Sequence, residues 1–101
     1  MIPDWATERR KMVEVQLRRR GIRDERVLAA MSEIPREEFV PAESRVVAYG
    51  DDPIHVGYGQ TISQPYMTAL MAELLRLTGT ETVLEVGAGC GYAAAVLGQL
   101  A

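Results

Sequence analysis

The residues that could do chemistry start with a run of alternating glycines near the end of the chain. Glu85 is followed by Gly87, Gly89 and Gly91, directly after the apolar and β-branched stretch 82–86. Because glycine has no Cβ, this backbone can turn sharply and let a ligand approach the main chain. A helix starting at Tyr92 would direct its N-terminal amides at the same loop. The pattern predicts a buried strand, a ligand-binding loop and a helix, in that order.

The spacing of these glycines favours one class of ligand. A dinucleotide-binding loop has Gly-x-Gly-x-x-Gly, with an acidic ribose partner about 20 residues later. This chain has Glu-x-Gly-x-Gly-x-Gly, which resembles the first motif of S-adenosylmethionine-dependent methyltransferases. A glycine-rich turn without any ligand is the alternative interpretation of the same residues.

A second stretch of chemical interest lies upstream, where a polar run over residues 60–64 follows Gly57 and Gly59. It offers hydroxyl and amide groups, and Pro65 fits the first turn of the helix that comes next. Ser63 has two interpretations: it caps that helix with its hydroxyl, or it takes part in a site.

Two further side chains carry weaker signals. His55, the one histidine, has no cysteine or carboxylate partners at ligand spacing, so no metal site is predicted. Cys90, the one cysteine, excludes an internal disulfide and is interpreted as a small filler beside the glycine loop.

Composition restricts the class of protein. The chain has 101 residues, 48% of them hydrophobic and 25% charged, with a formal net charge of −3. This balance argues against nucleic acid as the main partner. There is no apolar run of about 20 residues, so no membrane span is predicted. A reducing, cytoplasmic environment is expected.

The elements that must position these residues can be followed along the chain. Asp4 or Thr7 starts a helix that runs to about Arg20 and ends at Gly21, and Asp24 starts a second that ends at Pro35. A short helical segment follows over 37–48, then a turn over 49–53 and a short strand over 54–56. The residues assigned to the inner faces of the first two helices are Met12, Val13, Gln16, Leu17, Val27, Leu28, Met31 and Ile34.

The helix from Pro65 is expected to continue to Gly79. Its predicted inner face consists of Met67, Leu70, Met71, Leu74 and Leu75. We divide the chain into an N-terminal helical region, 1–53, and a region 54–101 that carries both loops. A parallel strand over 82–86 needs neighbouring strands, and Ala101 falls within a helical pattern, so the chain is expected to be part of a longer protein.

Five segments resemble the protein-L-isoaspartate O-methyltransferase family, whose members repair aged proteins. They are Gly21–Leu28, Pro35–Pro41, Ala48–Tyr49, Gly57–Tyr66 and Val83–Tyr92. The resemblance implies an α/β fold in which an N-terminal helical layer leads into the start of a Rossmann-like, S-adenosylmethionine-dependent methyltransferase sheet. It also implies methyl transfer from S-adenosylmethionine to the α-carboxylate of isoaspartyl residues, with activity expected only in a longer chain.

The resemblance also implies roles for individual residues. Ser63 is the catalytic residue, and the cofactor-binding set is Gln60, Thr61, Ile62, Ser63, Glu85, Gly87, Ala88, Gly89 and Gly91. Ala88 and Cys90 depart from the family, which often has threonine and serine there. The implied partners are isoaspartyl proteins and peptides, and the complete protein is expected to be a monomer. Two alternatives remain: a non-catalytic S-adenosylmethionine-binding module, and a helical interaction segment that does not bind the cofactor.

Overall fold

One continuous helix that changes its winding comes first among the described elements. The computed structural model describes residues 3–101, and in it α1 (Trp5–Met12) passes into a π-helical turn, η1 (Val13–Leu17), and a 3₁₀ turn, η2 (Arg18–Arg20). The Asp4 carboxylate accepts a hydrogen bond from the Thr7 backbone N–H, and Gly21 ends the helix at a φ of 102°. The predicted first helix and its buried residues Met12, Val13 and Leu17 are confirmed.

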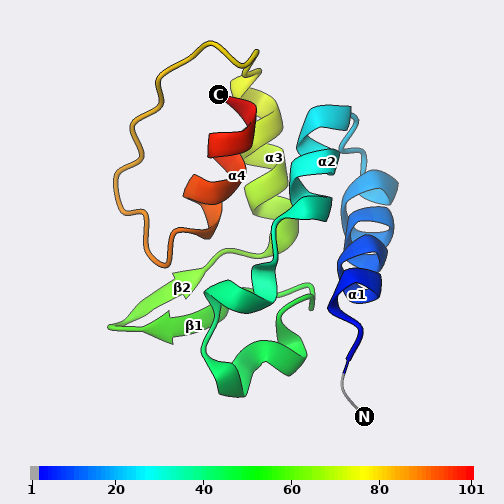
Figure 1. Cartoon of the computed structure of the whole chain (residues 1–101), viewed down its shortest axis with the longest axis vertical. Coiled ribbons are helices and arrows are strands. Elements are labelled where there is room, and N and C mark those ends of the chain that lie inside the picture. Colours follow the sequence, from blue (N-terminus) through cyan, green and yellow to red (C-terminus); the bar gives the residue numbers. More distant parts are fainter. Residues whose placement is uncertain (1–2) are drawn as a thin grey trace.

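Helix α2 (Glu25–Glu33) forms the centre of the helical layer. The Asp24 carboxylate accepts hydrogen bonds from the backbone N–H groups of Arg26 and Val27, as expected of an N-cap. The buried face of α2 packs on α1, α3 and α4. Figure 1 shows α2 between α1 on one side and the α3–α4 pair on the other.

Two 3₁₀ turns connect this layer to the hairpin. They are η3 (Arg36–Phe39) and η4 (Ala42–Val47), with Pro41 between them. The predicted short helical segment over 37–48 is therefore confirmed, although it is split in two. Arg36 and Glu37 are buried here despite their charges.

An antiparallel hairpin carries the polar run. Strand β1 (Ile54–Gly57) pairs with β2 (Gln60–Ile62), and Ile54 lies opposite Ile62. The tip is tight because Gly57, Tyr58 and Gly59 all have positive φ. The predicted strand over 54–56 is confirmed, and β2 is a strand that the sequence analysis did not predict.

Helix α3 (Pro65–Leu75) corrects three predictions. Its N-cap is Gln64 with no side-chain hydrogen bond, so Ser63 does not cap it. It ends at Leu75, before a left-handed Arg76, rather than at Gly79. The predicted inner face is wrong except at Leu70, which is half-buried and packs on the core. Met67, Met71, Leu74 and Leu75 are exposed, and the buried residues are Pro65, Thr68, Ala69 and Ala72. Small side chains on that face let α3 approach α2 and α4 closely.

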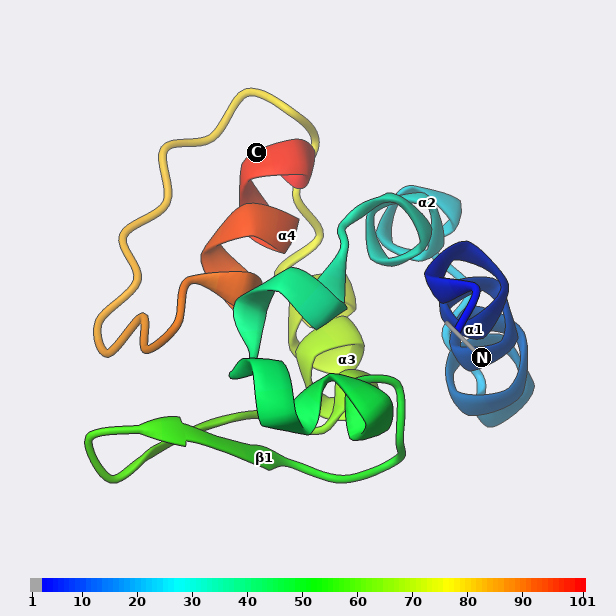
Figure 2. The ribbon, with the colours of Figure 1, turned by 60° about the horizontal axis from the view of Figure 1, so that its bottom comes forward.

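The segment between α3 and α4 (Tyr92–Leu100) corrects a fourth prediction. Residues 76–91 form a long loop without a strand, and the chain arcs away from α4 there (Figures 1 and 2). Leu84 and Val86 are 88% and 89% exposed, so the buried strand predicted over 82–86 is wrong. A parallel strand needs a neighbour to bond with, and within residues 3–101 the two strands pair only with each other.

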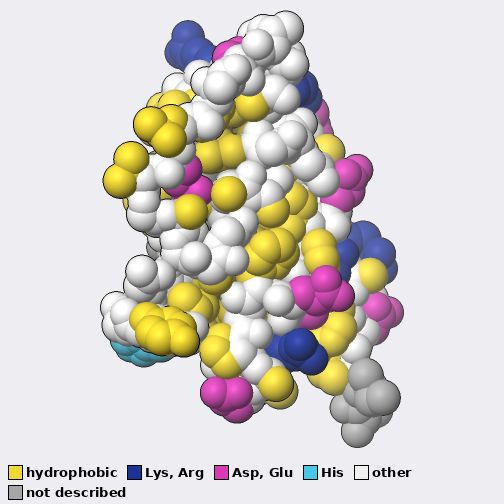
Figure 3. All heavy atoms as spheres, turned by 60° about the vertical axis from the view of Figure 1, so that its left-hand side comes forward, with side chains coloured by type: hydrophobic (Ala, Val, Ile, Leu, Met, Phe, Trp, Pro, Cys, Tyr) yellow, Lys and Arg dark blue, Asp and Glu magenta, His cyan; other side chains and the backbone are white. Residues whose placement is uncertain are grey.

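The core joins both halves of the chain. Buried side chains run from Met12 on the first helix to Val96 and Leu100 on α4, whose predicted existence is confirmed. The division at residue 53 stays a prediction. Exposed apolar side chains remain on the face that carries the long loop, as Figure 3 shows; they include Met71, Leu74, Leu75, Val83, Leu84 and Val86.

Candidate functional site

A cavity of about 210 Å³ lies where the end of the hairpin, α3 and the glycine loop meet. Seven of the nine residues assigned to the cofactor line it: Thr61, Ile62, Ser63, Glu85, Gly87, Ala88 and Gly89. The structure therefore brings together two stretches that the sequence analysis selected separately. Gln60 and Gly91 lie outside the lining.

A larger hollow of about 770 Å³ lies elsewhere, between Trp5, Tyr49 and His55. None of the predicted site residues line it. We therefore take the smaller cavity as the candidate site, because the chemistry of a lining says more about function than its volume does.

The glycine loop has the backbone that its sequence requires. Gly87, Gly89 and Gly91 have φ values of 77°, 57° and 89°, a region that residues with a Cβ rarely adopt. A Cβ on Gly87 or Gly91 would meet no atom within 4 Å, so both border open space. A ligand can approach the main chain there. The Gly91 N–H donates to the Ala88 carbonyl at 3.0 Å, which closes the turn before α4.

Glu85 provides the clearest sign of a missing binding partner. Its Oε1 atom is buried and accepts no hydrogen bond from the residues that the structure describes. A buried carboxylate oxygen without a donor is unfavourable. A ligand amine or hydroxyl group in the cavity would satisfy it.

These observations fit part of an S-adenosylmethionine site. The open glycine backbone and the unpaired Glu85 oxygen suit a polar ligand that carries donors. Pockets that enclose a ligand of drug size measure about 300–1,000 Å³, whereas this cavity measures about 210 Å³. The described residues can therefore enclose only part of such a cofactor.

The Ser63 backbone is fixed by a hydrogen bond, whereas its side chain is exposed. The Ser63 carbonyl accepts a hydrogen bond from Arg36 Nη2 at 2.9 Å. The side chain is exposed, and its hydroxyl forms no hydrogen bond within residues 3–101. It is therefore available to a ligand in the cavity.

The residue after Ser63 is held as well. Gln64 Nε2 donates to Asp51 Oδ1 at 2.7 Å, and Asp51 pairs with Arg20. The hydrogen bonds from Arg20 and Gln64 hold the pKa of Asp51 below its ordinary value. This ion pair anchors the start of α3 to the end of the first helix.

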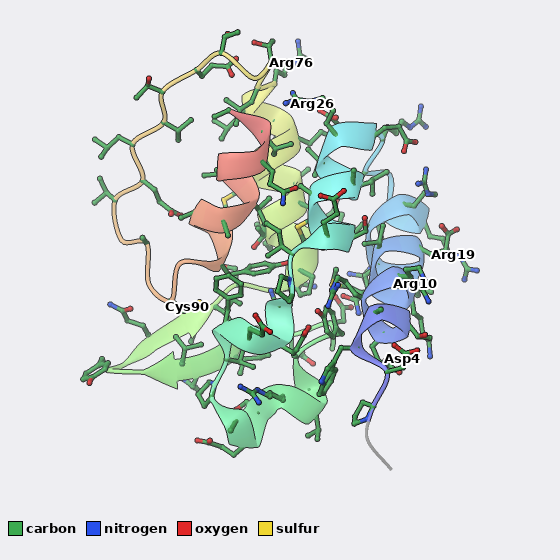
Figure 4. All side chains as sticks on the ribbon, in the orientation of Figure 1. Asp4, Arg10, Arg19, Arg26, Arg76 and Cys90 are labelled. Atoms are coloured by element: carbon green, nitrogen blue, oxygen red, sulfur yellow. The ribbon has the colours of Figure 1, made fainter. Side chains whose placement is uncertain are left out.

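Several residues of the lining were not predicted from the sequence. Thr68 and Met71 come from α3, and Tyr92 and Ala93 from the start of α4. The one available signal was Thr68, a polar residue between small ones on the buried face of α3. Cys90 is a half-buried free thiol at the end of the loop (Figure 4), so its interpretation as a filler agrees with its position.

Other kinds of site find no support in the described part of the chain. No group of three histidine, cysteine or carboxylate side chains there could hold a metal ion. His55 is exposed on β1. None of the helices in that part has the length and apolarity to cross a bilayer.

Comparison with known proteins places the chain among methyltransferases. Residues 7–101 match the family model described as Protein-L-isoaspartate(D-aspartate) O-methyltransferase. The chain therefore belongs to the protein-L-isoaspartate(D-aspartate) O-methyltransferase family, and the resemblance noted in the sequence is confirmed.

Curated relatives agree with this assignment. Protein-L-isoaspartate O-methyltransferase 2 of Anaeromyxobacter sp. (strain Fw109-5) is 64% identical over 95 residues, which cover 94% of this chain and 39% of that protein. Protein-L-isoaspartate O-methyltransferase of Roseiflexus sp. (strain RS-1) is 59% identical over 97 residues, covering 96% of this chain and 44% of that protein. The chain spans about two fifths of the length of these relatives.

Proposed function

We propose that the chain supplies the cofactor loop and the acceptor-positioning serine of a protein-repair methyltransferase. The reaction transfers a methyl group from S-adenosylmethionine to the α-carboxylate of L-isoaspartyl residues. The observation that supports this most directly is the shared cavity, in which Ser63 and Glu85 lie together although they are far apart in the sequence. Family membership supports the choice of substrate.

The chemistry needs few side chains. When bound, S-adenosylmethionine supplies an electrophilic methyl group on a sulfonium sulfur. An α-carboxyl group has a pKa of about 3.3–3.7, so the acceptor is already ionised at neutral pH and needs no general base. The Ser63 hydroxyl donates a hydrogen bond to this carboxylate and orients it. Alignment and exclusion of water then provide the rate enhancement.

The remaining residues would hold the cofactor. The Glu85 carboxylate would accept a hydrogen bond from a donor group of the ligand, and the main chain at Gly87, Ala88, Gly89 and Gly91 would bind the methionine part. Gln60, Thr61 and Ile62 approach from the hairpin. Since Ala88 and Cys90 lack a hydroxyl, a hydrogen bond that other members make at those positions is absent here or comes from the thiol.

The finer features of the complete protein are part of the same proposal. We infer a Rossmann-like sheet, a cytoplasmic monomer, and isoaspartyl proteins and peptides as partners. The helical layer of this chain and its hairpin then form the N-terminal side of that enzyme. The net charge of −3 favours neither nucleic acid nor an anionic membrane as a partner.

One observation favours a second candidate, a non-catalytic S-adenosylmethionine-binding module. The cavity encloses only part of a cofactor, and the chain spans about two fifths of its relatives. Such a module would bind the cofactor without completing a substrate cleft.

A chimera distinguishes the two candidates. This chain replaces the matching segment of the Anaeromyxobacter relative, and methyl ester formation is measured on an isoaspartyl peptide and on the same peptide with normal aspartate. We expect esterification of the isoaspartyl peptide alone, with the unmodified relative as the positive control. A chimera that folds and binds S-adenosylhomocysteine but forms no ester would instead support the binding module.

A further inference from the structure

Arg36 is a buried cation without a counter-ion. Its side chain is 0% exposed, and within residues 3–101 no carboxylate lies within ion-pair distance of its guanidinium. Its Nη1 atom is buried and also lacks a hydrogen-bond partner there. Burying such a group is unfavourable, and an apolar side chain of similar volume would be easier to accommodate.

The guanidinium instead connects three separate parts of the chain. Its Nε donates to the Ala48 carbonyl at 2.6 Å, and its Nη2 donates to the Ser63 carbonyl at 2.9 Å. Its Cζ lies 4.9 Å from the centre of the Tyr92 ring, a cation–π contact. Ala48 precedes the hairpin, Ser63 follows it, and Tyr92 follows the glycine loop.

Neither carbonyl has a partner from regular secondary structure. Ala48 and Ser63 lie outside the helices and strands, so the guanidinium supplies donors that a helix or a sheet would otherwise provide. The rigid fork of arginine can serve both carbonyls at once, whereas the ammonium of lysine is a single point. The geometry thus explains why this buried position holds an arginine.

We infer that Arg36 is a positioning residue that fixes Ser63 relative to the glycine loop. This inference rests on the proposed function, because it treats Ser63 and that loop as the two sides of one methyl-transfer site. Arg36 does not line the cavity, and it acts through the Ser63 main chain and the Tyr92 ring.

Carbonyl chemical shifts of the isotope-labelled 101-residue chain test the inference without any need for activity. Arg36→Met removes all donors, Arg36→Lys keeps a cation that serves one carbonyl, and Arg19→Met is the control for an exposed arginine. We expect Arg36→Met to move the ¹³C′ resonances of Ala48 and Ser63 and the amide resonances of residues 87–92, while those of Glu25–Glu33 stay in place. Arg36→Lys should give an intermediate response and Arg19→Met none.

Two outcomes of this experiment overturn the inference. One is an unchanged Ser63 resonance in the variants. The other is a change that spreads equally through Glu25–Glu33, since it would mean that Arg36 only supports the core. If Arg36→Met does not fold, the milder Arg36→Lys variant and Tyr92→Leu, which removes the aromatic ring under the guanidinium, replace it. The same resonances of Ala48, Ser63 and residues 87–92 are then measured.

Titration with S-adenosylhomocysteine separates this inference from the proposed function. We expect Arg36→Met to raise the Kd about tenfold and Arg36→Lys to raise it less, with the Kd of Arg19→Met unchanged. If the unmodified chain does not bind, the same titration is made in the chimera; if the chimera does not bind either, the proposed function fails, whereas the resonance shifts still decide the role of Arg36. Normal binding by Arg36→Met together with a shifted Ser63 resonance would contradict the coupling to the glycine loop.

Discussion

The Oε1 atom of Gln60 lies 3.6 Å from the position that a Cβ on Gly89 would occupy. This is an ordinary contact distance, so the hairpin meets the glycine loop at this point without crowding it. Gln60 does not line the cavity, although its side chain borders the glycine loop at Gly89. A substitution at Gly89 therefore tests the backbone of the loop rather than its packing.

Gly89→Ala should weaken cofactor binding through strain. Gly89 has a φ of 57°, and the left-handed region costs a residue with a Cβ roughly 1–2 kcal/mol. We expect the Kd for S-adenosylhomocysteine to rise about five- to thirtyfold, as measured by calorimetric titration.

Gly98→Ala provides the matched control. Gly98 lies inside α4, and a Cβ there would meet nothing within 4 Å. This variant should bind normally and gain about 0.5–1 kcal/mol of stability, because alanine favours a helix interior over glycine. Equal affinities for the two variants would argue against a role for the loop conformation.

Ser63→Ala should reduce methylation more than it reduces cofactor affinity. A hydrogen bond to a charged group contributes about 1.5–3 kcal/mol, so kcat/KM for an isoaspartyl peptide should fall about ten- to a hundredfold in the chimera. Ser32→Ala is the control, since the Ser32 hydroxyl donates only to the Ala29 carbonyl within α2. A Ser63→Ala chimera with unchanged kcat/KM would remove the role proposed for this hydroxyl.

Tyr49→Phe should destabilise the fold. The Tyr49 hydroxyl donates to the buried Glu37 carboxylate and accepts from Arg9 Nε at 2.8 Å. Burial raises the pKa of Tyr49 to about 12, so the hydroxyl keeps its proton throughout the neutral range.

We expect the free energy of unfolding of Tyr49→Phe to fall by about 1–3 kcal/mol, because Glu37 loses a buried donor. The midpoint of thermal unfolding should fall by about 4–8 °C for each kcal/mol. Tyr58→Phe, at the exposed tip of the hairpin, should leave the midpoint unchanged. Equal midpoints for the two variants would show that this network adds no stability.

Glu81 makes the start of the long loop sensitive to acid. Its carboxylate accepts hydrogen bonds from the backbone of Thr78, Gly79 and Thr80 and from the Thr78 hydroxyl. The Thr78 bonds, followed by that from Gly79, lower the pKa of Glu81 from 4.5 to about 2. A lowered pKa in the folded chain means that this local order is present above about pH 4.5 and is lost as the pH falls towards 2.

Amide resonances of Thr78 and Gly79, followed from pH 6 to pH 2, measure this transition. They should titrate with a midpoint near the lowered pKa of about 2. Glu81→Gln should abolish the titration. A midpoint at the ordinary glutamate value of 4.5 would show that these hydrogen bonds do not persist in solution.

Local signals allowed much of the helical layer to be predicted. Asp4, Asp24 and Gly21 mark helix ends through hydrogen bonds and a backbone conformation that depend only on nearby residues. The site stretches were likewise visible as unusual runs of polar residues and glycines, and the structure brings them together in one cavity.

The failed predictions involve partners that a local pattern does not specify. The prediction for α3 placed its large apolar side chains in the core. The buried face instead includes the small residues Ala69 and Ala72, which let neighbouring helices pack against α3. The stretch around Leu84 has the composition of a strand but no neighbouring strand within residues 3–101. A buried Arg36 has no sequence signal, since arginine is usually exposed.

Thermal unfolding of the 101-residue chain with and without excess S-adenosylhomocysteine tests the central claim most directly. A ligand that binds only the folded state must raise the midpoint, and at a hundredfold excess over Kd it adds about 2.7 kcal/mol of stability. We predict a cooperative transition that moves to higher temperature, and a smaller shift at the same ligand concentration in Gly89→Ala. A transition that does not respond to the ligand would contradict the claim that Ser63 and the glycine loop already form a cofactor site in this chain.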